Sequence, residues 1–192
     1  GPPTDDEFAR QFRQAFEGFR KRLQATYKSN VPTEQDILGQ VRSIIELLSK
    51  SSDRRLVLDR ATAGGKVVPE NIILRASAAG EAACLCILNS TGNSFTARIR
   101  NFVATFKSDS RPWRGLLFRD MRHGDLPDKG VGCTLLEEFR NHGGMIIRAD
   151  EDEVSTISAV YETLVAVEER DISVREHPAD KGRLAAFLTS EG

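Results

Sequence analysis

An α/β fold is predicted by the sequence: a mixed sheet with an antiparallel meander half and a parallel βαβ half, flanked by helices, plus a long amphipathic helix at the amino terminus. Three observations lead to it. Apolar residues recur every three or four positions through the first fifty residues, three short aliphatic segments with glycine-containing turns follow, and helix-like and strand-like segments alternate beyond residue 88. A length of 192 residues suits one domain with an appendage.

Composition narrows the class of protein. Hydrophobic residues make up 40% and charged residues 29%, which is typical of a folded globular chain. No window approaches the roughly 18 consecutive apolar residues of a membrane span, and the amino terminus is acidic and polar, unlike a secretory signal. Three cysteines are too few for a disulfide framework or for a zinc site made of cysteine alone. We therefore expect a cytoplasmic protein.

Residues 1–30 are predicted to form a basic amphipathic helix. Thr4 and Glu7 have the spacing of a capping box at its start. One face carries a stripe of six apolar side chains, and the other carries five basic ones: Phe8, Phe12, Phe16, Phe19, Leu23 and Tyr27 against Arg10, Arg13, Arg20, Lys21 and Arg22. Such a helix packs its stripe either on the rest of the chain or on another domain or subunit, and both alternatives stay open.

Residues 31–170 are predicted to form the α/β domain. Pro32 ends the first helix, and Thr33 with Asp36 begins a second one that runs to Leu48. Strands are then expected at residues 55–58, 72–76 and 82–88, with turns at Gly64-Gly65 and Ala79-Gly80. Their short connections favour an antiparallel meander.

Beyond residue 88 the alternation of helices and strands indicates a parallel arrangement. Helices are expected at residues 94–107, 134–141 and from Asp150 onward, and strands at residues 115–118 and 145–147. Connections of this length join parallel strands through crossover helices. Residues 171–192 are expected to form a carboxyl-terminal tail or short helix.

From residue 33 to residue 120, the predicted order is helix, three strands, helix and strand. This order resembles the core of the restriction-endonuclease-like nucleases. The resemblance implies an acidic residue on the second strand and an acid-x-lysine triplet on the third, which together hold a divalent metal ion beside the scissile phosphate. The third strand here reads Ala83-Cys84-Leu85-Cys86-Ile87 and has no such triplet. We expect either a nuclease-like scaffold without its catalysis or an accidental likeness.

The loop at residues 89–94 is the first candidate site. It lies before a helix amino terminus, at the carboxyl edge of the expected parallel sheet, where backbone N–H groups and the helix dipole favour an anion. Four small polar side chains add donors: Asn89, Ser90, Thr91 and Ser94. The loop lacks the Gly-Lys-Ser/Thr ending of a phosphate-binding P-loop. The alternative is a plain turn in which Asn93 or Ser94 caps the helix.

Two further predicted strands end in charged residues, Arg119 and Asp120 after one, and Arg148 with Asp150 after the other. In a parallel sheet these ends meet residues 89–94 at one edge. Arginine and hydroxyl groups around a cleft there would bind a phosphorylated or nucleic-acid ligand. The alternative is that they form ion pairs and helix caps.

Charge is unevenly distributed, although the net charge is only −1. Residues 94–122 carry seven basic and two acidic side chains, whereas the stretch from Ala149 onward carries four basic and eleven acidic ones. Six arginines of this basic strip are candidate contacts to DNA or RNA phosphates: Arg98, Arg100, Arg111, Arg114, Arg119 and Arg122. The alternative is that the strip pairs with the acidic carboxyl-terminal helix or with a subunit.

No motif identifies a chemistry, and neither a cofactor nor a metal ion is expected. His123, His142 and His177 are too scattered for a metal site or a nucleophile–base pair. The Gly-Pro-Pro start is typical of tag removal, so we expect a piece of a larger bacterial protein that processes nucleic acid. The sequence thus favours a non-catalytic nucleic-acid- or partner-binding module. The alternatives are a metal-dependent nuclease or phosphate-ligand enzyme at the sheet edge, and a protein-interaction or oligomerisation domain.

Overall fold

The computed structural model describes residues 1–51, 56–63, 66–76, 82–107 and 113–190. They group into two compact units. The α/β unit comprises Pro32–Leu38 and Arg54–Asp150, and the helical unit comprises Gly1–Val31, Gly39–Asp53 and Glu151–Gly192. The predicted division into residues 1–30, 31–170 and 171–192 concerns independent folding and stays a prediction.

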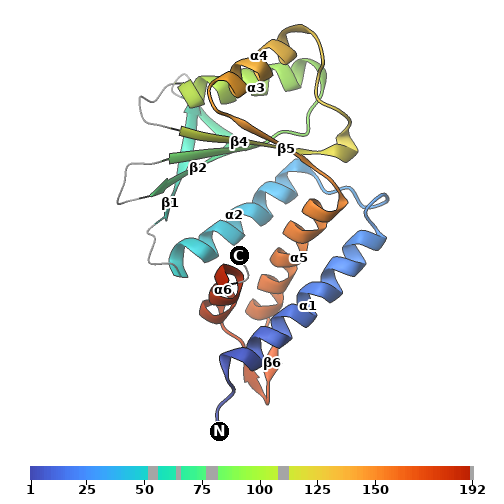
Figure 1. Cartoon of the computed structure of the whole chain (residues 1–192), viewed down its shortest axis with the longest axis vertical. Helices are drawn as coiled ribbons and strands as arrows, with labels where there is room; N and C mark the ends of the chain where they lie inside the picture. Colours follow the sequence, from blue (N-terminus) through green and yellow to red (C-terminus); the bar gives the residue numbers. More distant parts are fainter. Residues whose placement is uncertain (52–55, 64–65, 77–81, 108–112, 191–192) are drawn as a thin grey trace. The chain divides into compact units, whose positions relative to one another are not determined.

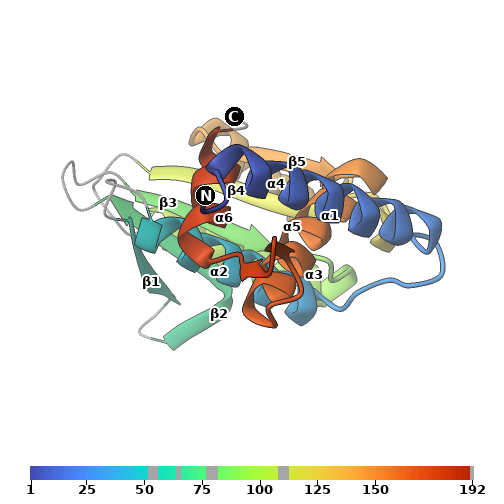
Figure 2. The same cartoon turned by 90° about the horizontal axis from the view of Figure 1, so that it is seen from below.

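The α/β unit is built on one five-stranded sheet in the order β1-β2-β3-β4-β5. Its strands are β1 (Leu56–Ala63), β2 (Lys66–Ala76), β3 (Ala82–Ile87), β4 (Trp113–Asp120) and β5 (Met145–Ala149). β1, β2 and β3 pair antiparallel, and β3, β4 and β5 pair parallel. The antiparallel pair β1 and β2 forms one edge of the sheet (Figure 2). The predicted mixed sheet with a meander half and a parallel half is therefore confirmed.

Two crossover helices, α3 (Gly92–Lys107) and α4 (Gly130–Asn141), cover the same face of this sheet (Figure 1). The connections from β3 to β4 and from β4 to β5 each move one strand along the sheet in the same direction. Because crossovers between parallel strands have the same hand, both helices lie on one face of the sheet. Cys84 and Cys86 lie two residues apart on β3 and face these helices together. Phe102 of α3 meets Phe139 of α4 with ring centroids 5.1 Å apart. This layer of aliphatic and aromatic side chains is the core of the unit.

Helix α2 (Glu34–Ser51) begins with the reciprocal cap that the sequence predicts. The Thr33 backbone N–H donates to Asp36 Oδ2 at 3.0 Å, and the Asp36 N–H donates to Thr33 Oγ1 at 3.1 Å. These hydrogen bonds from Thr33 hold the pKa of Asp36 below its usual value. Ile37 and Leu38, in the first turn and a half, are buried.

Several predicted elements differ from the structure in length. β1 and β2 extend toward each other well beyond residues 55–58 and 72–76, because pairing with a neighbour recruits residues that have no apolar alternation of their own. α4 begins at Gly130, four residues before the predicted start at residue 134, and Met121–His123 form a 3₁₀ turn after β4. The predicted turns at Gly64-Gly65 and Ala79-Gly80 lie outside the described residues.

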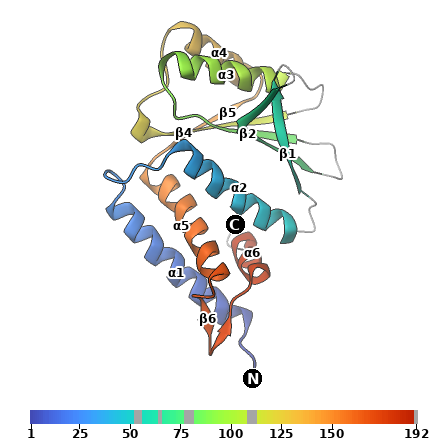
Figure 3. The same ribbon diagram turned by 180° about the vertical axis from the view of Figure 1, so that it is seen from behind.

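The helical unit packs α1 (Asp5–Ala25) against α5 (Glu151–Glu168) and α6 (Lys181–Ser190), seen side by side in Figures 1 and 3. The predicted capping box of Thr4 and Glu7 is present at the start of α1. Phe8 and Phe12 are buried with Leu164 and Leu184, so the amino-terminal part of the aromatic stripe packs within this chain. None of the described helices is both long and apolar enough to span a bilayer.

Residues 171–192 contain more structure than a tail. A two-stranded hairpin of β6 (Ser173–Val174) and β7 (His177–Pro178) precedes α6. Arg175 and Glu176, at the hairpin tip, both have positive φ angles, which is the geometry of a tight two-residue turn. Neither residue is glycine or asparagine, so the usual sequence signal for such a turn is absent.

Candidate functional site

The carboxyl edge of β3 and β4 brings together four of the residues expected there. The Asp120 backbone N–H donates to Asn89 Oδ1 at 2.9 Å, and Arg119 donates to the Ser90 carbonyl at 2.6 Å. These contacts join positions about thirty residues apart, because parallel pairing of β3 with β4 aligns their last residues. On β5, the neighbouring strand, Arg148 pairs in register with Arg119.

Arg119 is a buried cation that holds two loops together. Its guanidinium donates to four backbone carbonyls: Leu88 at 3.2 Å, Ser90 at 2.6 Å, His123 at 2.9 Å and Gly124 at 3.0 Å. The side chain is 1% exposed and lies 6.0 Å from the centroid of the Phe95 ring. Burial lowers its pKa from the usual arginine value. Four of its five N–H groups are thus occupied by the loops after β3 and β4.

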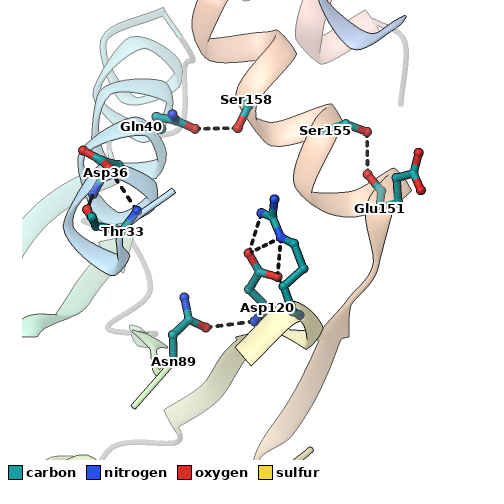
Figure 4. A network of polar contacts seen from close by, with 9 residues as sticks. Thr33, Asp36, Gln40, Asn89, Asp120, Glu151, Ser155 and Ser158 are labelled. Atoms are coloured by element: carbon teal, nitrogen blue, oxygen red, sulfur yellow. Dashed lines mark hydrogen bonds and ion pairs between the residues drawn. The ribbon is translucent and has the colours of Figure 1, made fainter. Parts of the chain in front are cut away.

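Asp120 is fully buried and bonded to the turn that follows it, as Figure 4 shows. The Arg122 side chain approaches its two oxygens in a fork, with Nε 3.0 Å from Oδ1 and a terminal nitrogen 2.6 Å from Oδ2. The Arg122 backbone N–H also donates to Oδ1 at 3.0 Å, so Asp120 caps the 3₁₀ turn. Carboxylate and guanidinium therefore satisfy each other.

Asn89 connects this edge to the start of α2. Its backbone N–H donates to Glu34 Oε2 at 2.9 Å, and the other oxygen of Glu34 forms an ion pair with Arg98. Burial lowers the pKa of Arg98. Glu34 was not predictable as part of this site, because no local pattern links the first turn of α2 to residues 55 and 64 positions away. Its only signal was an acidic side chain beside the cap residue Thr33.

Three buried side-chain atoms at this edge have no hydrogen-bond partner within the described part of the chain: Asn89 Nδ2, Ser90 Oγ and His123 Nε2. All three belong to the two loops that Arg119 holds. Buried polar groups normally find a partner, and an ordered water supplies it where protein atoms do not. Thr91 and Ser94 are exposed beside them, around the amino terminus of α3. The edge is therefore rich in donors.

The remaining arginines of the basic strip have a different environment. Arg100 on α3 and Arg114 on β4 are exposed, and Arg111 lies outside the described residues. Two further arginines, Arg140 and Arg148, are exposed on α4 and β5. Within the ranges that the structure covers, none of these four exposed arginines has an ion-pair partner. Arg140 falls outside the strip and was not singled out from the sequence.

The described residues contain no cluster of three or more histidine, cysteine, aspartate or glutamate side chains suited to a metal ion. Cys84 and Cys86 are buried under α3, and burial raises the pKa of the Cys84 thiol to about 12. A thiol with that pKa is a poor nucleophile at neutral pH. Cys133 on α4 is partly exposed.

Two carboxylates at this edge are already engaged, since Asp120 pairs with Arg122 and Glu34 pairs with Arg98. Comparisons of the chain with protein-family models, with curated proteins and with solved structures give no match.

Proposed function

We propose that the α/β unit is a binding module for nucleic acid that has no catalytic site of its own. The observation that carries the proposal is the set of four exposed arginines, Arg100, Arg114, Arg140 and Arg148, which lack a carboxylate partner among the described residues. Exposed arginines without internal partners are free to bind phosphate oxygens in a bidentate manner.

The charge of the two units supports this proposal. The α/β unit has 15 basic and 12 acidic residues, a net charge of +3, whereas the helical unit has 12 basic and 16 acidic residues, a net charge of −4. The net charge of −1 for the whole chain hides this difference. A polyanion is therefore attracted to the α/β unit.

Pairing at the sheet edge favours binding over phosphodiester cleavage. A cleavage site needs carboxylates that are free to hold a metal ion or to activate water. Asp120 and Glu34, two of the carboxylates at this edge, are each already paired with an arginine. The missing acid-x-lysine triplet on β3 points the same way.

The exposed arginines of the basic strip can be tested separately from those that the protein itself already holds. We expect Arg100→Glu combined with Arg114→Glu to weaken binding of a labelled duplex, because both side chains are exposed. The slope of log K against log salt should fall by roughly 0.9 for each lost phosphate contact. Fluorescence anisotropy across a salt series measures both quantities. Arg170→Glu, an exposed charge reversal on the helical unit, is the matched control and should change neither.

Two results would contradict the proposal. One is an absence of binding at micromolar protein and low salt, which would favour the protein-interaction alternative. The other is equal loss of binding in the Arg170→Glu control, which would show that only the overall charge matters. Circular dichroism of each variant establishes that the fold is intact.

A further inference from the structure

The helical unit has an open groove of about 490 Å³ beside α1. Side chains of α1 form one wall, and the segment between α5 and β6 forms the other: Gln11, Gln14, Ala15, Gly18, Phe19 and Arg22 against Asp171, Ile172 and Ser173. Ile172 is buried, whereas the two glutamines, Asp171 and Ser173 are exposed. Apolar side chains (Ala15, Phe19 and Ile172) and polar ones therefore line the groove together.

Small residues of α1 hold this groove open. A Cβ atom added at Gly18 would meet no heavy atom within 4 Å, so the space beside it is unoccupied by protein. One turn further along, the Arg22 guanidinium lies 5.0 Å from the centroid of the Phe19 ring. Phe19 thus supports an arginine that is itself exposed at the groove. Guanidinium groups of this kind stack well on flat aromatic ligands.

A row of cations runs along α1 next to the groove. Arg10 and Lys21 are exposed on the side of the helix opposite the buried Phe8 and Phe12. Lys21 lies eleven positions after Arg10, about 16 Å along the axis. From Phe8 to its end at Ala25, α1 has five basic side chains and one acidic one, and that acid, Glu17, pairs with Arg20 at 3.5 Å. Although the helical unit as a whole is net acidic, Arg10 and Lys21 thus form a locally basic surface on α1.

We propose that this groove and the adjacent cations bind single-stranded nucleic acid. Phosphates would lie along Arg10 and Lys21, and an unpaired base would enter the groove and stack on Arg22. Gln11, Gln14 and Asp171 would then offer donors and acceptors to its hydrogen-bonding edge. A duplex keeps its bases stacked and paired, so it cannot fill the groove in this way. The proposal shares its class of ligand with the proposed function but uses none of the arginines of the α/β unit.

Gly18→Leu tests the groove in the full-length chain. The leucine side chain would fill the space, and we expect binding of a labelled oligo-dT to weaken about tenfold, the loss of one stacked base. The salt slope should stay unchanged, because no phosphate contact is removed. Leucine also improves helix propensity, so the thermal midpoint should not fall. Gly39→Leu is the matched control, since Gly39 is an exposed glycine of α2 with equally open surroundings.

The cations are tested by combining Arg10→Glu with Lys21→Glu, which should lower the salt slope for oligo-dT by roughly 0.7 for each residue. Unchanged oligo-dT affinity in Gly18→Leu, or equal losses for oligo-dT and a duplex, would overturn the groove proposal. Displacement of oligo-dT by poly-glutamate at equal charge concentration would also overturn it, in favour of an acidic protein partner. The two proposals can fail separately. If the Arg100 and Arg114 variant loses duplex binding while the α1 variants bind oligo-dT normally, the groove proposal alone is refuted. If the α1 variants lose oligo-dT binding while the Arg100 and Arg114 variant binds the duplex normally, the proposed function alone is refuted.

Discussion

Arg119 shows how a charged side chain identified from the sequence can take a structural role. An arginine at a strand end has the same local sequence whether it binds a ligand or its own backbone. Here it is 1% exposed and donates to four carbonyls of two loops, so its charge is balanced by aligned peptide dipoles. The buried fork between Asp120 and Arg122 completes the same corner of the sheet.

Replacing Arg119 should therefore destabilise the fold. Lysine keeps the charge but offers three donors on a point-like group, so Arg119→Lys leaves carbonyls unsatisfied and should cost about 3 kcal/mol in the free energy of unfolding. Urea denaturation followed by circular dichroism measures this cost. Arg114→Lys, at an exposed site of the same strand, should change the free energy by less than about 0.5 kcal/mol. Equal effects at the two positions would contradict the assigned role of Arg119.

The three thiols should differ in reactivity. In the folded protein at pH 8, a maleimide should label the partly exposed Cys133, while Cys84 and Cys86 should react only after denaturation. Mass spectrometry of the labelled protein counts the modified thiols. Labelling of Cys84 at the rate of Cys133 would show that α3 opens readily from the sheet.

Cys84 also predicts a dependence of stability on pH. Its pKa is about 12 in the folded chain, against an ordinary cysteine pKa of 9.0. Between these values the unfolded chain binds fewer protons than the folded one, so stability should fall as pH rises, by up to about 1.4 kcal/mol per pH unit. Urea titrations at pH 8, 9 and 10 measure the slope. The slope should be smaller in Cys84→Ala, and an unchanged slope would assign the effect to other groups.

Helix α1 has two faces with separate roles. Phe8 and Phe12 fill the core of the helical unit, and Phe12 contacts Phe187 of α6 with ring centroids 5.6 Å apart. Its first turn is also tied down by charge, since Asp5 pairs with Arg183 at 3.2 Å and Glu7 pairs with Arg175. The opposite face carries the exposed cations Arg10 and Lys21. Because the two faces are distinct, variants of each can be tested independently.

Replacing an aromatic residue of the α1 stripe by alanine should lower the free energy of unfolding, and the loss should be larger where the ring is more deeply buried. Phe12→Ala removes a ring that is 1% exposed and should cost about 3–5 kcal/mol, through lost burial and the cavity it leaves. Phe16→Ala, at a partly exposed position of the same stripe, should cost markedly less. Thermal and urea denaturation compare the two variants. Equal costs would indicate that Phe16 is covered in solution, for example by a second copy of the chain.

For the molecule as a whole, we expect no nuclease activity. Incubation of linear and single-stranded DNA with the pure protein in Mg²⁺ or Mn²⁺ should leave the substrate intact, because Asp120 and Glu34 are paired with arginines and β3 lacks the acid-x-lysine triplet. Gel electrophoresis detects any cleavage. Cleavage that disappears in Asp120→Asn, with the fold retained, would contradict both this expectation and the proposed function.

Local sequence patterns were enough to predict the helices, the strands and the class of fold. Capping pairs such as Thr33 with Asp36, aromatic spacing in α1 and the alternation beyond residue 88 are local signals, and the helices and strands of the mixed sheet follow from them. Strand lengths were less predictable, since pairing between β1 and β2 depends on a neighbour. The order of elements behind the nuclease resemblance is present, while the family relation stays a prediction.

Which charged side chains are exposed to a ligand, in contrast, depends on tertiary contacts. Arg98, Arg100 and Arg119 are equivalent in the sequence. In the structure, however, Arg98 pairs with Glu34, 64 residues away, and Arg100 is exposed. Arg119 is held by backbone carbonyls of two loops. The groove beside α1 likewise joins residues about 150 positions apart. Local patterns report propensity and periodicity, whereas burial and pairing of a charge depend on segments that only folding brings together.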